Sequence, residues 1–368
     1  GRAGVVVAGP VAAGAAPKPP DPRLGALAGE PAALAVAIAV REFLFRGNGC
    51  GSDGPGQRSG GCDPSRLSGF LAGLETGPIQ QVGSLEIVPL VAGERDGGPD
   101  LLLHEALAKG LVEIRELGRG VVQELEASSA ADVPVLILEG ETLVGSKQNR
   151  IVAATILVPP RGKVVVPVGC MERGRWSARG PAFGCGVSKA SPAVRSGSLR
   201  AVVLQRSSGG EDRLDQMRLW QDVDLRMACA RVNSPTHDYH EMMGRREASL
   251  RDRAASFIPM EGQVGAVALW RGRLLGIELA GHPGTWAASA GRALPAFVLA
   301  ADEADAEPGA APPPIERTAR EWLDALAAGE ITERPARGLG VDLAVRGDRI
   351  EAAGLWHDGR PVHLVAFA

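Results

Sequence analysis

The stretch from Val135 to Trp176 constrains the fold of this chain most strongly. Short apolar runs rich in Val, Ile and Leu alternate there with dense clusters of polar residues. Apolar runs of this length, separated by turn residues such as Pro159–Gly162, predict β-strands. Polar clusters at the ends of buried strands are common places for functional sites. We therefore expect a sheet in this region and look first for a site within it.

Short strands recur through the rest of the chain at intervals of about ten residues. A hairpin is expected across Arg271–Gly272, and helical spacing of apolar residues predicts helices over Pro283–Leu294 and Ile315–Ala328. Residues Arg179–Gly197 are rich in Gly, Ser and Pro and are expected to form a loop. This pattern predicts an α+β fold with an antiparallel, β-rich core, either a sandwich or an open barrel, and packed helices.

Composition divides the chain into two parts. Residues 1–65 are rich in Gly, Ala and Pro, and such a segment buries too little apolar surface to offset its ordering entropy. We expect a disordered or low-complexity segment there. Residues 66–368 are expected to form a single integrated domain, with a β-rich part at 66–190 and an α+β part at 191–368 as possible sub-units. The acidic, Pro-rich residues 302–314 are expected to lie at the surface.

The charge and cysteine content exclude several classes of protein. The formal net charge of −3 gives no global positive field that would attract nucleic acid or an anionic membrane. Five cysteines without a C-x-x-C pair argue against a disulfide framework and a zinc ribbon. The apolar run Ala32–Val40 is too short to span a bilayer. We therefore expect a cytoplasmic protein, without a nucleic-acid or membrane partner.

Two motifs in the central stretch carry a resemblance to a known family. The first runs from Glu139–Gly140–Glu141 into Leu143–Arg150, and the second is Pro167–Trp176. In these motifs the chain resembles the ARG and rhodanese-phosphatase-superfamily-associated protein family, type one (ARPP-1-like), from about Leu67 to the C-terminus. The resemblance implies an association with ADP-ribosylglycohydrolases and a role in NAD or ADP-ribose metabolism. It brings no catalytic residue with it.

The candidate ligand-binding residues are donors and an aromatic ring in these two motifs. Side-chain N–H groups can hold a phosphate and a ribose or base edge, arginine can bind phosphate bidentately, and tryptophan can stack on a base. The alternative is an exposed loop whose cations pair with Glu139 or Glu141, together with an ordinary salt bridge and a core tryptophan. The candidate residues are Lys147, Gln148, Asn149, Arg150, Arg175 and Trp176.

Candidate catalytic residues lie in the same motifs. If the strand continues through Gly140, Glu139 and Glu141 share one face with Cα atoms ~6.5–7 Å apart, a separation suited to paired acid and base catalysis. Cys170 becomes a nucleophile if neighbouring arginines lower its pKa, and it is a buried structural thiol otherwise. Glu172 is a further candidate, in the wall of the site. The alternative for both Glu139 and Glu141 is that they balance nearby cations.

Two hypotheses about the function remain open. The first is binding of, or accessory enzymatic action on, an ADP-ribose- or NAD-type nucleotide through residues 139–150 and 170–176. The second is a non-catalytic protein-interaction or structural domain, and the protein partners stay open. His237 and His240 are one helical turn apart, but a position at a helix start favours capping over metal binding. We expect no metal site, and the pattern indicates no particular cofactor.

Overall fold

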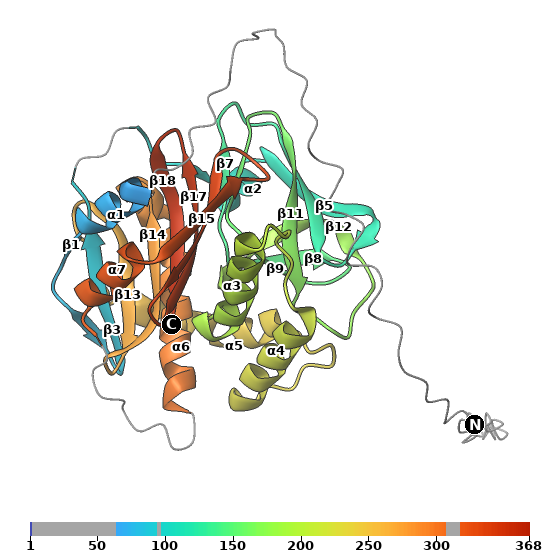
Figure 1. Ribbon diagram of the computed structural model, residues 1–368. Helices are drawn as coiled ribbons and strands as arrows, with labels where there is room; N and C mark the ends of the chain where they lie inside the picture. Colours follow the sequence, from blue (N-terminus) through green and yellow to red (C-terminus); the bar gives the residue numbers. More distant parts are fainter. Residues whose placement is uncertain (2–63, 94–96, 307–316) are drawn as a thin grey trace, which may run out of the picture. The chain divides into compact units, whose positions relative to one another are not determined.

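A computed structural model describes residue 1 and residues 64–93, 97–306 and 317–368 (Figure 1). The described residues from 64 to 368 group into one unit by their contacts, and the fold below belongs to that unit. The segment predicted to be disordered or low in complexity, residues 1–65, lies almost entirely outside the described residues. Among the described residues, no helix is both long and apolar enough to cross a lipid bilayer.

The largest sheet has nine antiparallel strands drawn from both ends of the described chain. β2 (Gln80–Val82) pairs only with β3, at the side of the sheet. The other strands, in spatial order, are β1 (Glu75–Thr76), β3 (Leu85–Val91), β13 (Gln263–Trp270), β14 (Arg273–Ala280), β18 (Arg360–Phe367), β17 (Ile350–His357), β16 (Val341–Gly347) and β15 (Glu330–Pro335). Because β3 pairs with β13, the N-terminal strands and the C-terminal strands are parts of one sheet.

Helices cover both faces of this sheet. Helices α1 (Pro64–Ala72) and α7 (Ala319–Ala327) pack together on one face, where Val267 of β13 joins their core. Helix α6 (Pro283–Asp305) covers the other face, where Ala266 and Ala268 join a second core. A strand buried on both faces needs apolar residues at consecutive positions, which explains the nearly continuous apolar run of β13.

A second sheet of six antiparallel strands contains most of the predicted central stretch. In spatial order its strands are β12 (Arg179–Lys189), β8 (Glu141–Ser146), β9 (Arg150–Val152), β11 (Lys163–Cys170), β6 (Glu124–Ser129) and β5 (Val112–Val121). The edge strands β12 and β5 contact each other, so the sheet is strongly curled. Beside it, β10 (Ile156–Val158), β7 (Val135–Ile137) and β4 (Leu101–Leu102) form a small sheet in which β4 and β7 are parallel.

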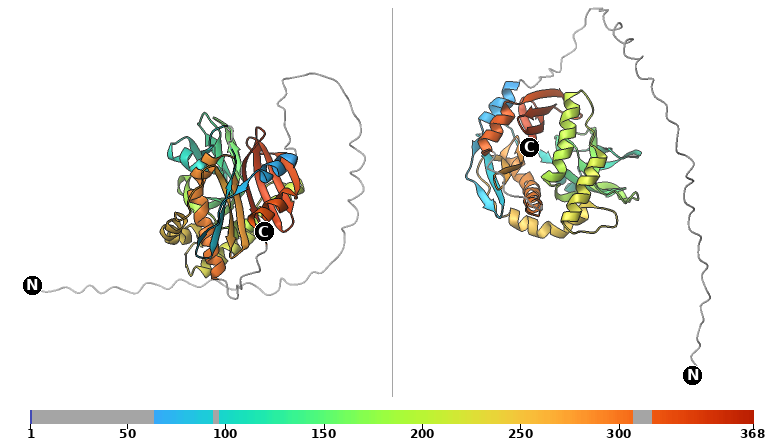
Figure 2. Two further views of the ribbon diagram at one scale, coloured as in Figure 1. Left: turned by 90° about the vertical axis from the view of Figure 1, so that its left-hand side faces the viewer. Right: turned by 60° about the horizontal axis from the view of Figure 1, so that its bottom comes forward.

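Four helices connect or cover these sheets. Helix α2 (Leu103–Ala108) packs against the curled sheet, and α3 (Pro192–Ser207) packs against β16 and β17. Helices α4 (Gln216–Cys229) and α5 (Tyr239–Ala254) follow along the chain. Helix α6 contacts both β13 and β12, so it lies between the two large sheets (Figure 2).

The structure confirms the α+β class and the antiparallel, β-rich core. The hairpin across Arg271–Gly272 is present as β13 and β14. Two local predictions were wrong. The residues expected as a loop, Arg179–Gly197, form the strand β12 and the first turns of α3. The helix expected to end at Leu294 continues through Pro295 to Asp305, so the first residues of the expected surface segment are helical.

Candidate functional site

The two candidate acids Glu139 and Glu141 flank a sharp turn. Gly140 has a φ of +78°, β7 ends before it and β8 begins after it, so the strand does not continue through this glycine. Glu139 pairs with Arg195 of α3, whereas the Glu141 carboxylate lies 3.4 Å from Nε of Arg292 in α6. The two carboxylates therefore face different partners and do not share one strand face.

Glu139 belongs to a buried network of two acids and two cations. Arg195 donates to the Glu139 carboxylate from Nε at 3.1 Å and from Nη2 at 2.6 Å, and from Nη1 to Glu278 at 3.1 Å. Lys189 also pairs with Glu278, and all four residues are at most 2% exposed. Burial opposes ionisation of Glu278, but the charges of Lys189 and Arg195 outweigh it and hold its pKa well below the ordinary value.

The same network extends to the C-terminal strand. The backbone N–H of Glu139 donates to Thr155 Oγ1 at 3.1 Å, and Thr155 Oγ1 lies 2.7 Å from Nδ1 of His363 in β18. Burial lowers the pKa of His363, which favours its neutral form. Glu139 is thus an internal ion-pair partner that joins α3, β14 and β18, and its carboxylate is already occupied.

Arg175 and Glu172 form a second internal pair. The Arg175 guanidinium donates from Nε and Nη2 to the two Glu172 carboxylate oxygens, at 2.8 and 2.6 Å. Its Nη1 donates to the carbonyl oxygens of Ser146 and Ser177, at 2.5 and 2.8 Å. A guanidinium has five N–H donors, and these contacts employ all of its nitrogens. Arg175 therefore holds the loop that follows β11 in place.

The amide side chains of Gln148 and Asn149 also bind this loop. Asn149 Nδ2 donates to both Asp238 carboxylate oxygens at 3.0 Å, and Gln148 Nε2 donates to the carbonyl oxygen of Glu172 at 2.9 Å. Gln148 Oε1 accepts from Arg150 Nη1 at 2.9 Å. Both amides are less than a tenth exposed. These buried amides hold the loop in place beneath the exposed part of the candidate site.

Trp176 is the candidate that faces solvent most openly. Its side chain is 51% exposed, Lys147 Nζ lies 5.1 Å from its ring centre, and the Arg150 guanidinium lies 5.9 Å from it. Arg150 itself is fully buried, and its Nε and Nη2 have no hydrogen bond within the described part of the chain. Its nearest carboxylate oxygen, on Glu116, is 3.8 Å away. An exposed aromatic ring with two cations beside it is the arrangement that remains open to a ligand.

Comparison with known proteins gives a family match that spans almost the whole described fold. The family model described as the ARG and Rhodanese-Phosphatase-superfamily-associated Protein domain matches residues 73–367. The chain belongs to this family. The match covers every strand of both large sheets and all the candidate residues. The chain matches no curated protein and no solved structure.

Cys170 is buried in this family member. Its side chain is fully covered, and its Sγ donates to the carbonyl oxygen of Glu172 at 3.2 Å. Burial raises the pKa of the Cys170 thiol, although Arg150 acts in the opposite direction. A thiolate nucleophile needs a lowered pKa, whereas the pKa of Cys170 is raised. These features support the alternative interpretation, a buried structural thiol.

Several polar residues that the sequence analysis did not select lie around Glu141. Neither Glu141 oxygen accepts a hydrogen bond from a described residue, and Nε and Nη2 of Arg292 and Nδ1 of His104 also have no described hydrogen-bond partner. Burial raises the pKa of the nearby Cys185 thiol, and the Glu141 charge adds to this effect. A single Arg or His on a helix gives no signal of its own, because its partner lies on a distant element.

The histidines considered for metal binding have other contacts. His237 Nδ1 lies 2.9 Å from an Asp224 carboxylate oxygen, and the Asp238 carboxylate accepts from the backbone N–H of His240 at the start of α5. In residues 64–93, 97–306 and 317–368, no group of three or more His, Cys, Asp or Glu side chains is placed to hold a metal ion.

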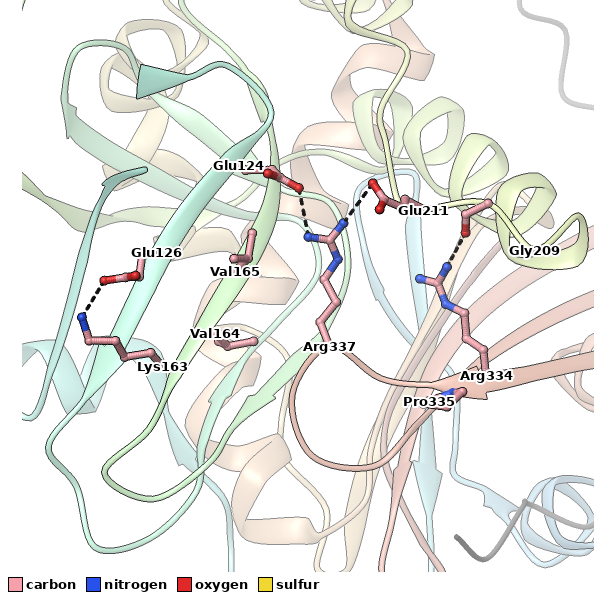
Figure 3. Close-up of a pocket in the computed structure, with 11 residues that line it drawn as sticks. Glu124, Glu126, Lys163, Val164, Val165, Gly209, Glu211, Arg334, Pro335 and Arg337 are labelled. Atoms are coloured by element: carbon pink, nitrogen blue, oxygen red, sulfur yellow. Dashed lines mark hydrogen bonds and ion pairs between the residues drawn. The ribbon is translucent and has the colours of Figure 1, made fainter. Parts of the chain in front are cut away.

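A wide pocket of about 630 Å³ lies elsewhere, between the curled sheet and β15 (Figure 3). Arg337 in its wall lies between Glu124, at 3.1 Å, and Glu211, at 3.8 Å, and Lys163 pairs with Glu126. None of the candidate residues from the sequence lines this pocket. Its three acids and three cations cancel, so it offers no net charge to an anionic ligand.

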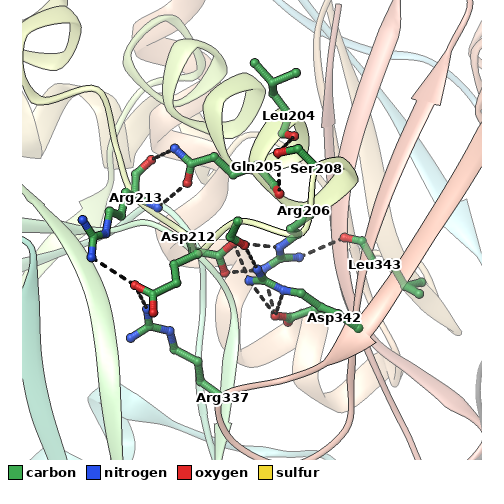
Figure 4. Close-up of polar contacts among 12 residues, drawn as sticks. Leu204, Gln205, Arg206, Ser208, Asp212, Arg213, Arg337, Asp342 and Leu343 are labelled. Carbon is green, nitrogen blue, oxygen red and sulfur yellow. Dashed lines mark hydrogen bonds and ion pairs between the residues drawn. The ribbon is translucent and has the colours of Figure 1, made fainter. Parts of the chain in front are cut away.

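Behind this pocket, a buried cluster joins α3 to the C-terminal strands. Arg206 donates to both Asp212 carboxylate oxygens, at 3.0 and 2.9 Å, and to the carbonyl oxygen of Leu343 at 2.9 Å (Figure 4). Arg334 Nη2 pairs with Asp212 at 2.5 Å and with Asp342 at 3.3 Å. These charged side chains pair with one another, so they stabilise the fold behind the pocket.

Proposed function

We propose that the protein binds an ADP-ribose- or NAD-type nucleotide at the surface around Trp176. The observation that carries the proposal is the half-exposed Trp176 ring with the cations of Lys147 and Arg150 beside it. Such a ligand has an aromatic base and anionic phosphates, which match an exposed ring and neighbouring cations. The family membership adds support through the implied association with ADP-ribosylglycohydrolases.

We assign different roles to the candidate residues within this proposal. Trp176 stacks on the base and Lys147 attracts the phosphates. Arg150 lies below the surface and contributes positive charge from there, while Arg175, Gln148 and Asn149 hold the loop that presents Trp176. Arg179, which pairs with Ser146 across two strands, is exposed beside Lys147 and adds to the positive charge.

The proposal includes a cytoplasmic location and leaves catalysis open. The described cysteines Cys170, Cys185 and Cys229 are free thiols, which is typical of proteins in a reducing compartment. The two candidate acids face different partners, so the site as described supports binding more directly than glycosidic-bond hydrolysis.

Calorimetric titration with ADP-ribose tests the proposal. Stacking contributes ~1–3 kcal/mol per base, so Trp176→Ala should weaken binding by about fivefold to a hundredfold while the melting temperature changes little. Lys147→Ala should weaken binding through loss of a charge-assisted contact worth ~1.5–3 kcal/mol. Ribose 5-phosphate, which has no base, should bind more weakly than ADP-ribose to the unaltered protein.

Met217→Ala is the matched control, because Met217 is another large apolar side chain that is 62% exposed. It should bind ADP-ribose like the unaltered protein. If Trp176→Ala binds ADP-ribose with unchanged affinity, the site is not at this surface. If neither ADP-ribose nor NAD binds at all, the nucleotide proposal fails as a whole.

A second candidate function is a non-catalytic protein-interaction domain. A mostly apolar pocket of about 370 Å³ is lined by residues of β3, α6 and the segment after α5. Ile258 in its wall is 73% exposed, and Ile79, next to the lining residue Gln80, is 62% exposed. Exposed apolar side chains around a pocket are typical of interaction surfaces. This candidate takes first place if the nucleotide titrations are negative.

A further inference from the structure

A third pocket, of about 280 Å³, lies where the first turn of α3 meets the nine-stranded sheet and the last turns of α6. Its wall combines apolar side chains with three charged ones, and none of the residues proposed for nucleotide binding takes part. The lining residues that matter below are Arg226, Arg273, Glu303, Ser196, Leu274 and Phe367.

Glu303 is an unpartnered acid in this wall. It is only 6% exposed, and neither of its carboxylate oxygens has a hydrogen bond within the described part of the chain. Nε of Arg226, which lines the same pocket, is also buried without a described hydrogen-bond partner, whereas the Ser191 hydroxyl lies outside the lining and is close enough to Glu303 to lower its pKa. Buried polar groups normally have hydrogen-bond partners, so an acid and an arginine that lack them at one pocket indicate a polar ligand or water there.

The charge around the pocket is positive. Arg226 of α4 and Arg273 of β14 both line it, against one acidic side chain, Glu303, and the terminal residue Ala368 at the exposed rim. Pro192 and Ala193 come from the first turn of the 16-residue helix α3, where the helix dipole is positive, and Ser196 comes from the next turn. The N-cap residue Ser191 makes no capping hydrogen bond with its side chain. An ammonium ligand would meet two arginines and a positive helix end, whereas an anion would be attracted by all three.

We propose that this pocket binds a small organic acid, whose carboxylate lies between Arg226, Arg273 and the start of α3 and beside the buried Glu303 carboxyl group. The short apolar body of the ligand packs on Leu274 and Phe367. The volume lies at the lower end of the range for ligand pockets, which suits a monocarboxylate with few carbon atoms. The site is independent of the proposed nucleotide site, because the two share no residue.

The protonation state of Glu303 determines the affinity of the pocket for an anion. Burial raises the pKa of Glu303 to about 7, against the opposing effects of Arg226, Ser191 and Arg246. Asp302 acts in the same direction as burial, and Tyr239 also faces this acid. Protonated Glu303 can donate to a carboxylate, whereas ionised Glu303 repels it. Affinity for the anion should therefore fall as the pH rises through 7.

The test is calorimetric titration of the full chain with butyrate and benzoate at pH 6 and pH 8. Both acids should bind saturably, and the affinity should be up to roughly tenfold lower at pH 8, because a group with this pKa loses most of its proton between the two values. Butylammonium should not bind. Inorganic phosphate separates recognition of the apolar body from anion binding alone, and it should bind more weakly than butyrate.

Three variants and a control complete the test. Arg226→Gln and Arg273→Gln should each weaken butyrate binding by about tenfold or more, since each removes a charge-assisted contact. Glu303→Gln should keep affinity at both pH values and abolish the pH dependence. Arg251→Gln is the control, because Arg251 is an exposed arginine of α5 that pairs with Glu247 and does not line the pocket.

Three results would overturn the proposal. They are no saturable binding of either acid, binding that both arginine variants leave unchanged, and a pH dependence that persists in Glu303→Gln. Because Arg273 is exposed, its variant should fold normally even if Arg226→Gln is unstable. Failure of ADP-ribose to bind would leave these results unaffected, so the two proposals fail separately.

Discussion

The guanidinium of Arg195 donates to the Glu139 carboxylate from two nitrogens, Nε at 3.1 Å and Nη2 at 2.6 Å. Gly140, the next residue along the chain, lies against this guanidinium, and a Cβ atom there would be 2.3 Å from Arg195 Nε. The positive φ of Gly140 and this close approach both require glycine. The Glu139–Gly140 turn is therefore shaped by an arginine from a helix that follows much later in the sequence.

Replacing Arg195 should destabilise the fold strongly. Arg195→Met leaves Glu139 and Glu278 with only Lys189 as a buried cation, and breaking a buried pair costs ~3–5 kcal/mol. Urea denaturation measures the loss. The control is Arg200→Met on the same helix, whose exposed pair with Glu351 is worth ~0–1 kcal/mol. Equal losses in the two variants would contradict the role assigned to this network.

Local sequence patterns could predict the strands and the polar character of this region. The hairpin over β13 and β14 follows from two apolar runs around Arg271–Gly272, and the buried run Val135–Ile137 marks a strand. Glu278, a lone acid within the apolar strand β14, is a sequence signal of a buried ion pair. A charge in such a run needs a partner.

The partners themselves could not be predicted from one sequence. Arg195 and Arg292 reach the central stretch from α3 and α6, and no local pattern gives the register between these helices and the sheet. The shared strand face expected for Glu139 and Glu141 depended on an extended Gly140, but glycine also adopts positive φ freely. The strand β12 was missed because its glycines resemble a loop.

Cys170 should resist alkylation in the folded protein. It is fully buried and its pKa is raised, so little thiolate is present near neutral pH and reagent cannot reach it. Cys229 at the end of α4 is exposed and should react with iodoacetamide before Cys170. Peptide mapping by mass spectrometry compares the two sites, and in urea both should react. Modification of folded protein at Cys170 as fast as at Cys229 would indicate an accessible, activated thiol.

Glu303 should make the fold less stable as the pH rises from 4.5 to 7. Its pKa is raised from an ordinary value of 4.5 to about 7, so in this window the unfolded chain releases a proton that the folded chain retains. The free energy of unfolding should fall by at most ~1.4 kcal/mol per pH unit through this group. Below pH 4.5 the acid is protonated in both states, and above pH 7 the destabilisation is complete.

Glu303→Gln isolates this contribution. The difference in free energy of unfolding between the variant and the unaltered protein should grow in favour of the variant from pH 4.5 to 7 and then stay constant. Urea denaturation at a series of pH values measures it. A difference that does not change with pH would mean that Glu303 titrates normally in the folded state.

Arg175→Lys tests whether Arg175 holds the Trp176 loop or contacts the ligand. Lysine keeps a positive charge beside Glu172 but has three donors at one nitrogen, and it cannot also reach the carbonyl oxygens of Ser146 and Ser177. We expect the loss of ~1–3 kcal/mol of stability from carbonyl groups left unpaired. Affinity for ADP-ribose should fall as well, because the loop that presents Trp176 is less well fixed. Trp176→Ala should lower the affinity alone. A melting temperature unchanged in Arg175→Lys, together with weaker ADP-ribose binding in calorimetry, would show instead that Arg175 contacts the ligand directly.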